Sequence, residues 1–314
     1  VKSRCVVLDS YTNKGVGYKM SIIVPFRADK KNRERAKHLK KFKESMETFL
    51  RKVKNKFITD GVIAEIEVII VKQSIDKQKF NRGALLNAGY LLHPDSTVYV
   101  FHDVDLIPND KMVDVYAKVY QANSIVHFAG GWSKYNSDKN YIGGVTLIGN
   151  QLFREINGFP NDYQGWGGED DEIARRLKTI EKDNTLEKVT IKGYEDLEEI
   201  KTAKGKRELL DKNPDMDNLE KYELRDQHKA TWETNGISLG EKDMNDLFHV
   251  QKSEESPKEY YTLYETTVSI NLPNILQNKF RNDILPQSSY ESSEICSKQI
   301  LPYLTNERDF EIIL

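Results

Sequence analysis

The chain has 314 residues, of which 38% are hydrophobic and 31% charged, and its formal net charge at pH 7 is -2. This composition is typical of a globular protein with an ordinary core, and the near-neutral charge argues against a nucleic-acid or anionic-membrane partner. No apolar run approaches about 18 residues, so this sequence contains no predicted transmembrane segment.

Cysteine usage points to a reducing compartment. Only Cys5 and Cys296 occur, far apart, which argues against a disulfide framework or a zinc site. The sequence has no secretory signal peptide and no Asn-x-Ser/Thr sequon. We therefore expect a cytoplasmic protein, or one of the Golgi lumen if an N-terminal anchor was removed, since the sequence begins with Val1.

Strand and helix patterns alternate through the first half of the chain. Short apolar runs rich in β-branched residues predict strands at 20–26, 63–71, 97–105 and 124–130. Amphipathic spacing predicts helices at 30–56, 81–92 and 111–120. This alternation predicts an α/β fold with a mostly parallel central sheet flanked by helices.

The second half has a different character. Residues 181–226 are highly charged with sparse apolar positions, which predicts an exposed excursion, and 263–272 predicts a late strand. We therefore expect one domain over residues 1–272 and a C-terminal extension over 273–314. The basic stretch 30–43 keeps helical apolar spacing, which favours a solvated helix face over a nucleic-acid site.

Two carboxylates close the strand predicted at 97–105. In an extended chain, Asp103 and Asp105 point to the same side, at the carboxyl edge where open α/β sheets bind ligands. Such a pair suits a hard divalent cation that holds a diphosphate. The alternative is an ordinary turn before Pro108.

Polar residues also follow the neighbouring predicted strands. Asn81 or Asn87 is suited to a base or ribose, and Arg82 and Arg27 are suited to phosphate. Each of them alone is more often a cap or a surface ion pair. Together, at successive strand ends, they outline a nucleotide site.

The stretch GWGGEDDE at 165–172 combines glycines, one tryptophan and four acids. A helix that begins near Gly168 explains the last two acids, through the helix dipole and i,i+4 pairs with arginines. It does not explain the glycines around Trp166. Glycines let the backbone approach a ligand closely, and an aromatic ring beside it suits a sugar. Glu169 and Asp170 can accept hydrogen bonds from the sugar hydroxyls, and one of the two can serve as a base.

The stretches FNRGALLNAGY, FHDVDLIP and YIGGVTLIGNQLFREINGFPNDYQGWGGEDDE follow one another in this order. Over about residues 20–177 the chain resembles the β-1,4-galactosyltransferase family, inverting metal-dependent glycosyltransferases with the GT-A fold. Weaker similarity recurs at 221–239 and 264–272. The resemblance implies galactose transfer from UDP-galactose to a hydroxyl of a carbohydrate or glycoconjugate, with Mn²⁺ or Mg²⁺.

The resemblance also implies roles for matching residues. Asp170 would be the general base with Glu169 beside it, and Asp105 would bind the metal with Asp103 supporting. In the family, a tyrosine at the position of Tyr141 is associated with galactose as the donor sugar, whereas smaller residues there admit the N-acetyl group of N-acetylgalactosamine. The donor would contact Pro25, Phe26, Arg27, Phe80, Asn81, Arg82, Asp103, Tyr141, Gly143, Gly144 and Trp166. The acceptor would contact Gly167, Gly168 and Asp171.

The match breaks at one metal ligand. Family members supply a histidine after the acidic helix, but the matching region 196–208 has none. His228 aligns with a family histidine that is not a ligand, so His249 is the substitute candidate. Otherwise Asp105, the diphosphate and water alone would hold the metal. We expect His102 and His127 to be core residues.

Two further functions stay open. One is a UDP-N-acetylgalactosamine transferase module of a larger polysaccharide polymerase, and the other is a catalytically impaired UDP- or sugar-binding module. A nucleotidyltransferase also uses strand-end acids, but it does not call for GWGGEDD.

Overall fold

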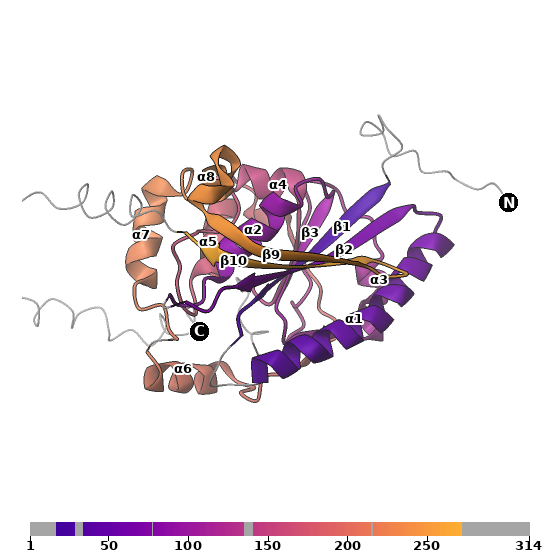
Figure 1. Ribbon diagram of the computed structural model, residues 1–314, viewed down its shortest axis with the longest axis horizontal. Helices are drawn as coiled ribbons and strands as arrows, with labels where there is room; N and C mark the ends of the chain where they lie inside the picture. The colour runs from indigo at the N-terminus through magenta and orange to yellow at the C-terminus, as the bar shows by residue number, and fades with distance from the viewer. Residues whose placement is uncertain (1–16, 29–33, 77, 135–140, 215, 272–314) are drawn as a thin grey trace, which may run out of the picture.

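The computed structural model describes residues 17–28, 34–76, 78–134, 141–214 and 216–271 (Figure 1). The predicted extension 273–314 lies outside the described residues, as do Cys5 and Cys296. None of the helices in the described ranges is long and apolar enough to cross a bilayer.

An eight-stranded sheet in the order β7-β5-β6-β3-β1-β2-β10-β9 forms the centre of the protein. The central strands β3, β1, β2 and β10 are parallel, and β6 and β9 run against their neighbours. This confirms the predicted α/β fold with a mostly parallel sheet. The strands are β1 (Tyr18–Phe26), β2 (Ala64–Gln73), β3 (Val98–His102), β5 (Ile125–His127), β6 (Val145–Gly149), β7 (Leu186–Lys188), β9 (Phe248–Pro257) and β10 (Thr262–Ile270). A separate two-stranded sheet pairs β4 (Leu106–Pro108) with β8 (Tyr194–Asp196).

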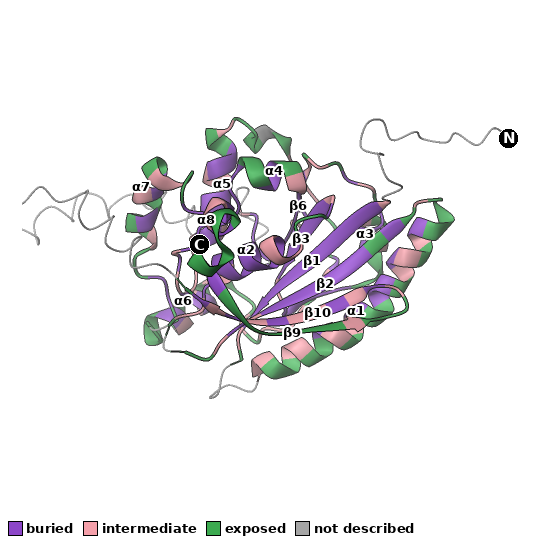
Figure 2. Ribbon diagram, turned by 45° about the horizontal axis from the view of Figure 1, so that its top comes forward, coloured by how far each residue is buried: buried purple, intermediate pink, exposed green. Residues whose placement is uncertain are grey.

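Helices cover both faces of the sheet and bury its central strands (Figures 1 and 2). One apolar core joins α1 (Glu34–Thr59) and α3 (Val113–Tyr116) to one face. The opposite core involves α2 (Arg82–Leu92), α4 (Asn150–Glu155), α5 (Glu169–Thr179) and α8 (Ile237–Lys242). Two further helices, α6 (Ala203–Lys212) and α7 (Lys221–Thr231), follow α5 in the chain. Three 3₁₀ turns span Asp110–Met112, Asp183–Thr185 and Met244–Asp246.

Several elements differ from the sequence-based expectation. The helix predicted at 111–120 is only a 3₁₀ turn and the short α3, in a segment whose β-branched valines have low helix propensity. The segment 181–226 is less exposed than its charge suggested. Its β7 pairs with β5 in the main sheet, and Leu210 and Leu224 are buried. As expected, His102 and His127 are buried in the core.

Three asparagines join α2 to the turn that precedes α5. Asn81 caps α2 by accepting from the Ala84 amide at 2.9 Å, and it donates to the carbonyl of Asn161 at 2.6 Å. Asn87 donates to the Asn161 side chain at 2.8 Å. A Cβ atom at Gly83 would collide with the backbone of the same turn, so glycine permits this close approach.

A buried ionic network anchors α5. Arg176 donates to Glu172 at 2.9 Å, and both side chains are inaccessible to solvent. Arg176 also donates to the carbonyls of Asn157 and Gly158 on the preceding turn. His228 of α7 bonds Asp162 at 2.9 Å. The network therefore fixes the first turn of α5 against the rest of the domain.

We expect Arg176→Met to lower the free energy of unfolding by about 3–5 kcal/mol, because it removes one of the cations paired with the buried Glu172 carboxylate and leaves several carbonyls without their donor. Arg154→Met is the matched control, since Arg154 pairs with Glu241 at the surface and should cost about 0–1 kcal/mol. Urea denaturation measures both values. Equal small losses would show that the buried network does not anchor α5.

Candidate active site

The two acids after β3 lie in a turn. β3 ends at His102, and the chain turns through residues 103–105 before it enters β4. The prediction that Asp103 and Asp105 share one side of an extended strand is therefore wrong. Asp103 contacts Arg82 at the start of α2, whereas Asp105 contacts Arg35 at the start of α1.

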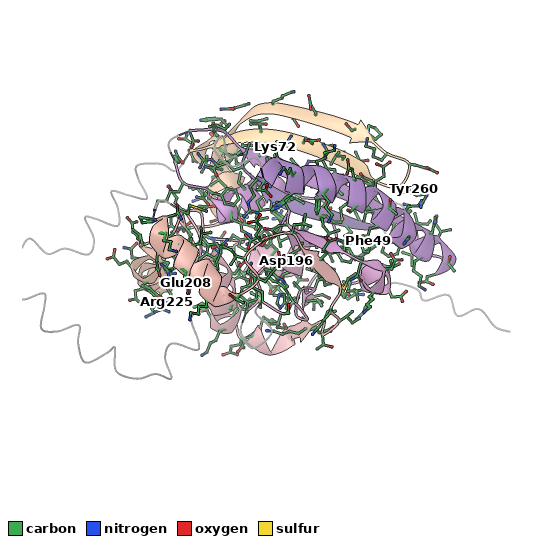
Figure 3. All side chains as sticks on the ribbon, turned by 90° about the horizontal axis from the view of Figure 1, so that it is seen from below. Phe49, Lys72, Asp196, Glu208, Arg225 and Tyr260 are labelled. Atoms are coloured by element: carbon green, nitrogen blue, oxygen red, sulfur yellow. The ribbon has the colours of Figure 1, made fainter. Side chains whose placement is uncertain are left out.

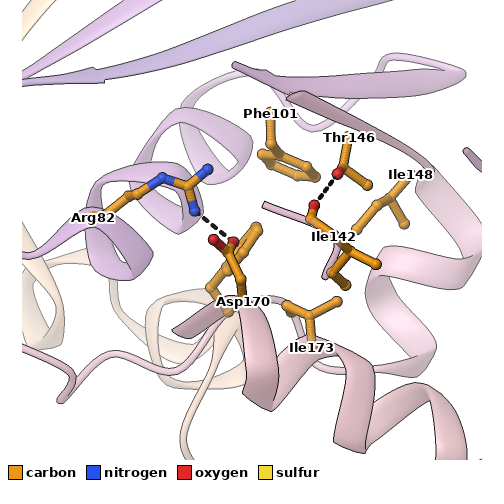
Figure 4. Close-up of a pocket in the computed structure, with 8 residues that line it drawn as sticks. Arg82, Phe101, Ile142, Thr146, Ile148, Asp170 and Ile173 are labelled. Atoms are coloured by element: carbon orange, nitrogen blue, oxygen red, sulfur yellow. Dashed lines mark hydrogen bonds and ion pairs between the residues drawn. The ribbon is translucent and has the colours of Figure 1, made fainter. Parts of the chain in front are cut away.

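Arg82 joins the turn to the first residues of α5. Its Nε donates to Asp103 Oδ1 at 2.8 Å, and its Nη1 donates to Asp170 Oδ1 at 2.8 Å. Nη1 also lies 3.6 Å from Glu169 Oε1. Figure 4 shows Arg82 reaching from α2 to Asp170 at the head of α5. Acids that are 67 residues apart in sequence, Asp103 and Asp170, thus share one guanidinium.

The Arg82–Asp170 pair lies against an apolar wall that includes Phe101, Ile142 and Ile173 (Figure 4). The cavity between them measures about 10 Å³, no more than a water molecule occupies. The low dielectric of such a wall strengthens charge interactions beside it. Burial, with the charge of Asp170, raises the pKa of Glu169 to about 8 although Arg82 opposes the shift. Glu169 Oε2 is buried and has no partner in the described structure.

The glycine-rich loop lies against residues from the charged segment. Gly165, Gly167 and Gly168 have φ values of 94°, 102° and 100°, which favour glycine. The Trp166 amide donates to the Met216 carbonyl at 2.8 Å, and its carbonyl accepts from the Asn218 amide at 3.1 Å. The loop is therefore held by a strand-like contact with the segment that precedes α7.

Gly143 lies between Asp170 and Tyr141. A Cβ atom there would collide with Asp170 Oδ2 and with the Tyr141 hydroxyl, so both groups abut the same backbone position. The next residue, Gly144, has φ of 80° and accepts from the Asp103 amide at 2.9 Å. Tyr141 therefore stands beside the carboxylates that Arg82 gathers.

The residues expected to bind the nucleotide divide into two groups. Arg27 follows β1 and donates to the carbonyls of Asp76 and Gln78, while the Phe80 carbonyl accepts from the Gly165 amide. These residues, with Pro25 and Phe26 at the end of β1, lie at the carboxyl edge of the sheet. Asn81 differs, because its side chain is buried and bonded to Ala84 and Asn161. Its predicted nucleotide contact is corrected to a structural role, and buried Asn87 has the same role.

The chemistry of Asp105 fits a hard divalent cation. Its carboxylate lies 2.7 Å from the Arg35 guanidinium, which shows that the position accepts positive charge. The other predicted ligand does not fit. His249 lies on the edge strand β9, separated from β3 by β1, β2 and β10, and it bonds Asn245 and Asn271. Among the described residues, no three His, Cys, Asp or Glu side chains form a metal cluster.

The charged residues around Asp105 were not predicted from the sequence. Arg35 bridges Asp105 and Glu198, and Glu198 also pairs with Lys134 and Lys206. Arg35 belongs to the basic stretch that we assigned to a solvated helix face. Glu198 and Lys206 belong to the charged segment expected to be exposed. Nothing in their local sequence distinguishes them from surface residues.

Two family models match consecutive parts of the chain. The family model described as the N-terminal region of glycosyl transferase group 7 matches residues 13–117, and the model described as the N-terminal domain of galactosyltransferase matches residues 124–201. The two matches are consecutive and include the turn at 103–105, Arg82 and Asp170. The chain belongs to the β-1,4-galactosyltransferase family.

Relatives in this family share a limited part of their length with the chain. β-1,4-Galactosyltransferase 7 of Drosophila melanogaster is 34% identical over 165 residues, covering 51% of this chain and 45% of the relative. β-1,4-Galactosyltransferase 4 of Mus musculus is 30% identical over 227 residues, covering 70% of this chain and 57% of the relative. The chain thus spans about half the length of these relatives.

The fold is also found among solved members of the family. The catalytic domain of Drosophila β-1,4-galactosyltransferase 7, solved with xylobiose, superimposes with a TM-score of 0.59 at 20% identity. The alignment covers 83% of this chain and 97% of that domain. A mutant of the same enzyme was solved with manganese, UDP-Gal and xylobiose. This likeness confirms the predicted GT-A fold.

The raised pKa of Glu169 predicts a pH dependence of stability. Between its ordinary value of 4.5 and about 8, the folded state holds a proton that the unfolded state has lost, so stability falls as pH rises through this window. Glu169→Gln should remove this component, while Glu223→Gln on the exposed face of α7 should keep it. Urea midpoints at about pH 5 and about pH 8 report the difference. If the urea midpoint changes equally between the two pH values in both variants, the pKa of Glu169 is not raised.

Proposed function

We propose that the protein transfers galactose from UDP-galactose to a hydroxyl of a carbohydrate or glycoconjugate, with inversion at the anomeric carbon. The observation that carries this proposal is Arg82, which gathers Asp103 from the sheet edge and Asp170 from the glycine-rich segment at 2.8 Å each. Relatives named as β-1,4-galactosyltransferases support the class of reaction, and the neighbour with UDP-Gal and xylobiose supports the type of substrates.

Asp170 is the proposed general base. A carboxylate in that place takes the proton from the acceptor hydroxyl as its oxygen forms the bond to the anomeric carbon, while the bond to the diphosphate breaks. Its present partner Arg82 suits the departing diphosphate equally well, because guanidinium binds phosphate and carboxylate oxygens alike. A bound diphosphate therefore competes for Arg82 and releases Asp170 for the acceptor. One base suffices, since no sugar–enzyme bond forms.

Other residues of the chain position the substrates. Arg27 at the end of β1 is proposed to contact the nucleotide, with Phe80 nearby at the same sheet edge. Trp166, on the glycine-rich loop, stacks on a sugar ring. Asp171, exposed on the first turn of α5, accepts hydrogen bonds from hydroxyls of the acceptor sugar. Glu169 is proposed to donate or accept a hydrogen bond to a sugar through its unpartnered Oε2.

Manganese is the proposed cofactor, supported by the metal in the solved neighbour and by the carboxylate chemistry of Asp105. When bound, such an ion offsets the charge that develops on the leaving diphosphate. Asp105 would hold it, and Asp103 supports the nucleotide sugar from the same turn.

The direct test is a UDP-release screen with Mn²⁺. It crosses UDP-galactose, UDP-N-acetylgalactosamine and UDP-glucose with a panel of monosaccharide and disaccharide acceptors. We expect acceptor-dependent UDP release that is greatest with UDP-galactose. Measurable UDP affinity without release from any donor would instead identify a binding module.

Asp170→Asn should lower kcat by about 10²–10⁴-fold, because the amide cannot take the acceptor proton. The affinity for UDP with Mn²⁺, measured by titration calorimetry, should change little. Asp226→Asn, on the exposed face of α7, serves as the control for general effects of losing a carboxylate. If UDP affinity falls as much as kcat, Asp170 is not the base.

Tyr141→Leu should raise the ratio of N-acetylgalactosamine to galactose transfer. The hydroxyl of Tyr141 abuts Gly143 next to Asp170, so a shorter side chain opens space beside the reacting sugar. Competition between the two UDP-sugars, read by mass spectrometry of the product, measures the ratio. An unchanged ratio would remove Tyr141 from donor selection.

A further inference from the structure

The short strand β8 brings Glu198 to the turn that contains Asp105. β8 pairs with β4 immediately after Asp105, and the Leu197 amide donates to the Asp105 carbonyl at 2.8 Å. Figure 3 labels Asp196, the last residue of β8, near the middle of this face of the protein. Glu198 thus follows directly on a backbone contact with Asp105, although 93 residues separate the two in sequence.

The guanidinium of Arg35 lies between the carboxylates of Asp105 and Glu198. Arg35 Nη1 is 2.7 Å from Asp105 Oδ2, and Arg35 Nη2 is 3.3 Å from Glu198 Oε1. The carboxylate side chains are only 10% and 17% exposed, whereas the side chain of Arg35 is 38% exposed. The acids are therefore the fixed part of this arrangement, and the guanidinium is the part that can leave towards solvent or a phosphate.

Two buried lysines hold Glu198 in its place. Lys134 contacts Glu198 Oε2, and Lys206 lies 2.9 Å from Oε1. Their side chains are 2% and 8% exposed. The orientation of the Glu198 carboxylate is thus set by its neighbours, as is usual for a metal ligand.

We infer that Glu198 is a ligand of the divalent cation, together with Asp105, and takes the place of the histidine that the β-1,4-galactosyltransferase family supplies. This inference rests on the proposed function for the presence of a metal. Glu198 lies in the 196–208 region where the family histidine was expected. None of the described histidines lies in this region: three are buried, and the others are on α1, after α2 and on β9 (His102, His127, His228; His38, His93, His249). In the absence of metal and diphosphate, the Arg35 guanidinium occupies the place between Asp105 and Glu198 that the cation would take.

An all-oxygen ligand set has a chemical consequence. Carboxylates favour Mn²⁺ and Mg²⁺, whereas imidazole favours ions such as Co²⁺ and Zn²⁺. The protein should therefore accept Mg²⁺ as well as Mn²⁺, and a histidine at position 198 should shift its preference.

The test is calorimetric titration of Mn²⁺ into the full chain saturated with UDP. Glu198→Gln should weaken Mn²⁺ binding by about tenfold or more, because the amide is a poor ligand. Glu195→Gln is the matched control, since Glu195 lies on β8, three residues before Glu198, with its side chain 59% exposed and paired with Lys41. Its Mn²⁺ affinity should equal that of the parent protein.

Glu198→His tests the same position by gain of a ligand. It should recover Mn²⁺ binding relative to Glu198→Gln and bind Co²⁺ more tightly than the parent protein does. Circular dichroism establishes that each variant folds. Should Glu198→Gln fail to fold, the parent and Glu198→His, compared for Mn²⁺, Mg²⁺ and Co²⁺, still decide the question.

Three results would overturn the inference. These are absence of Mn²⁺ binding to the parent protein with UDP, equal Mn²⁺ affinity in Glu198→Gln, or UDP binding that is unaffected by a chelator and strengthened in Glu198→Gln. The last would show that Arg35, Lys134 and Lys206 bind the diphosphate without a metal. Because the readout is binding, Glu198-dependent Mn²⁺ affinity without sugar transfer would reject the proposed transfer and keep the metal site.

Discussion

Charge compensation by Arg82 is the constraint on which the candidate site depends. Asp103, Glu169 and Asp170 come from two separate segments and would repel one another in a partly apolar environment. One guanidinium, itself only 11% exposed in its side chain, contacts all three. Because Arg82 opens α2 and α2 is locked to the turn before α5, the backbone places the cation where these acids converge.

Cationic side chains also lie around a second pair of acids, Asp105 and Glu198. Arg35 bridges Asp105 and Glu198 from the start of α1, and two lysines hold Glu198 from behind. Arg82 and Arg35 lie on helices that cover opposite faces of the sheet. A nucleotide diphosphate that enters at the sheet edge meets a guanidinium on each side, which suits its charge.

The sequence predicted the architecture well, because it is encoded locally. Alternating apolar runs and amphipathic segments fixed the order of β1, α1, β2, α2 and β3, and the glycine-rich acidic stretch indicated the start of α5. The prediction failed where long-range contacts decide a role. Asn81 looked available to a nucleotide, yet its partner is Asn161, 80 residues away. Glu198 looked like one more surface acid, yet it lies beside Asp105 through the pairing of β8 with β4.

In the proposed reaction one base, Asp170, faces the acceptor while the diphosphate leaves from the other side of the sugar. Proton NMR of the first product formed from UDP-galactose tests it most directly, through the coupling constant of the new anomeric proton. We expect a β-galactoside, because a single displacement inverts the α-linkage of the donor. A product that keeps the α configuration would contradict the account, since it requires a different arrangement of groups around the anomeric carbon.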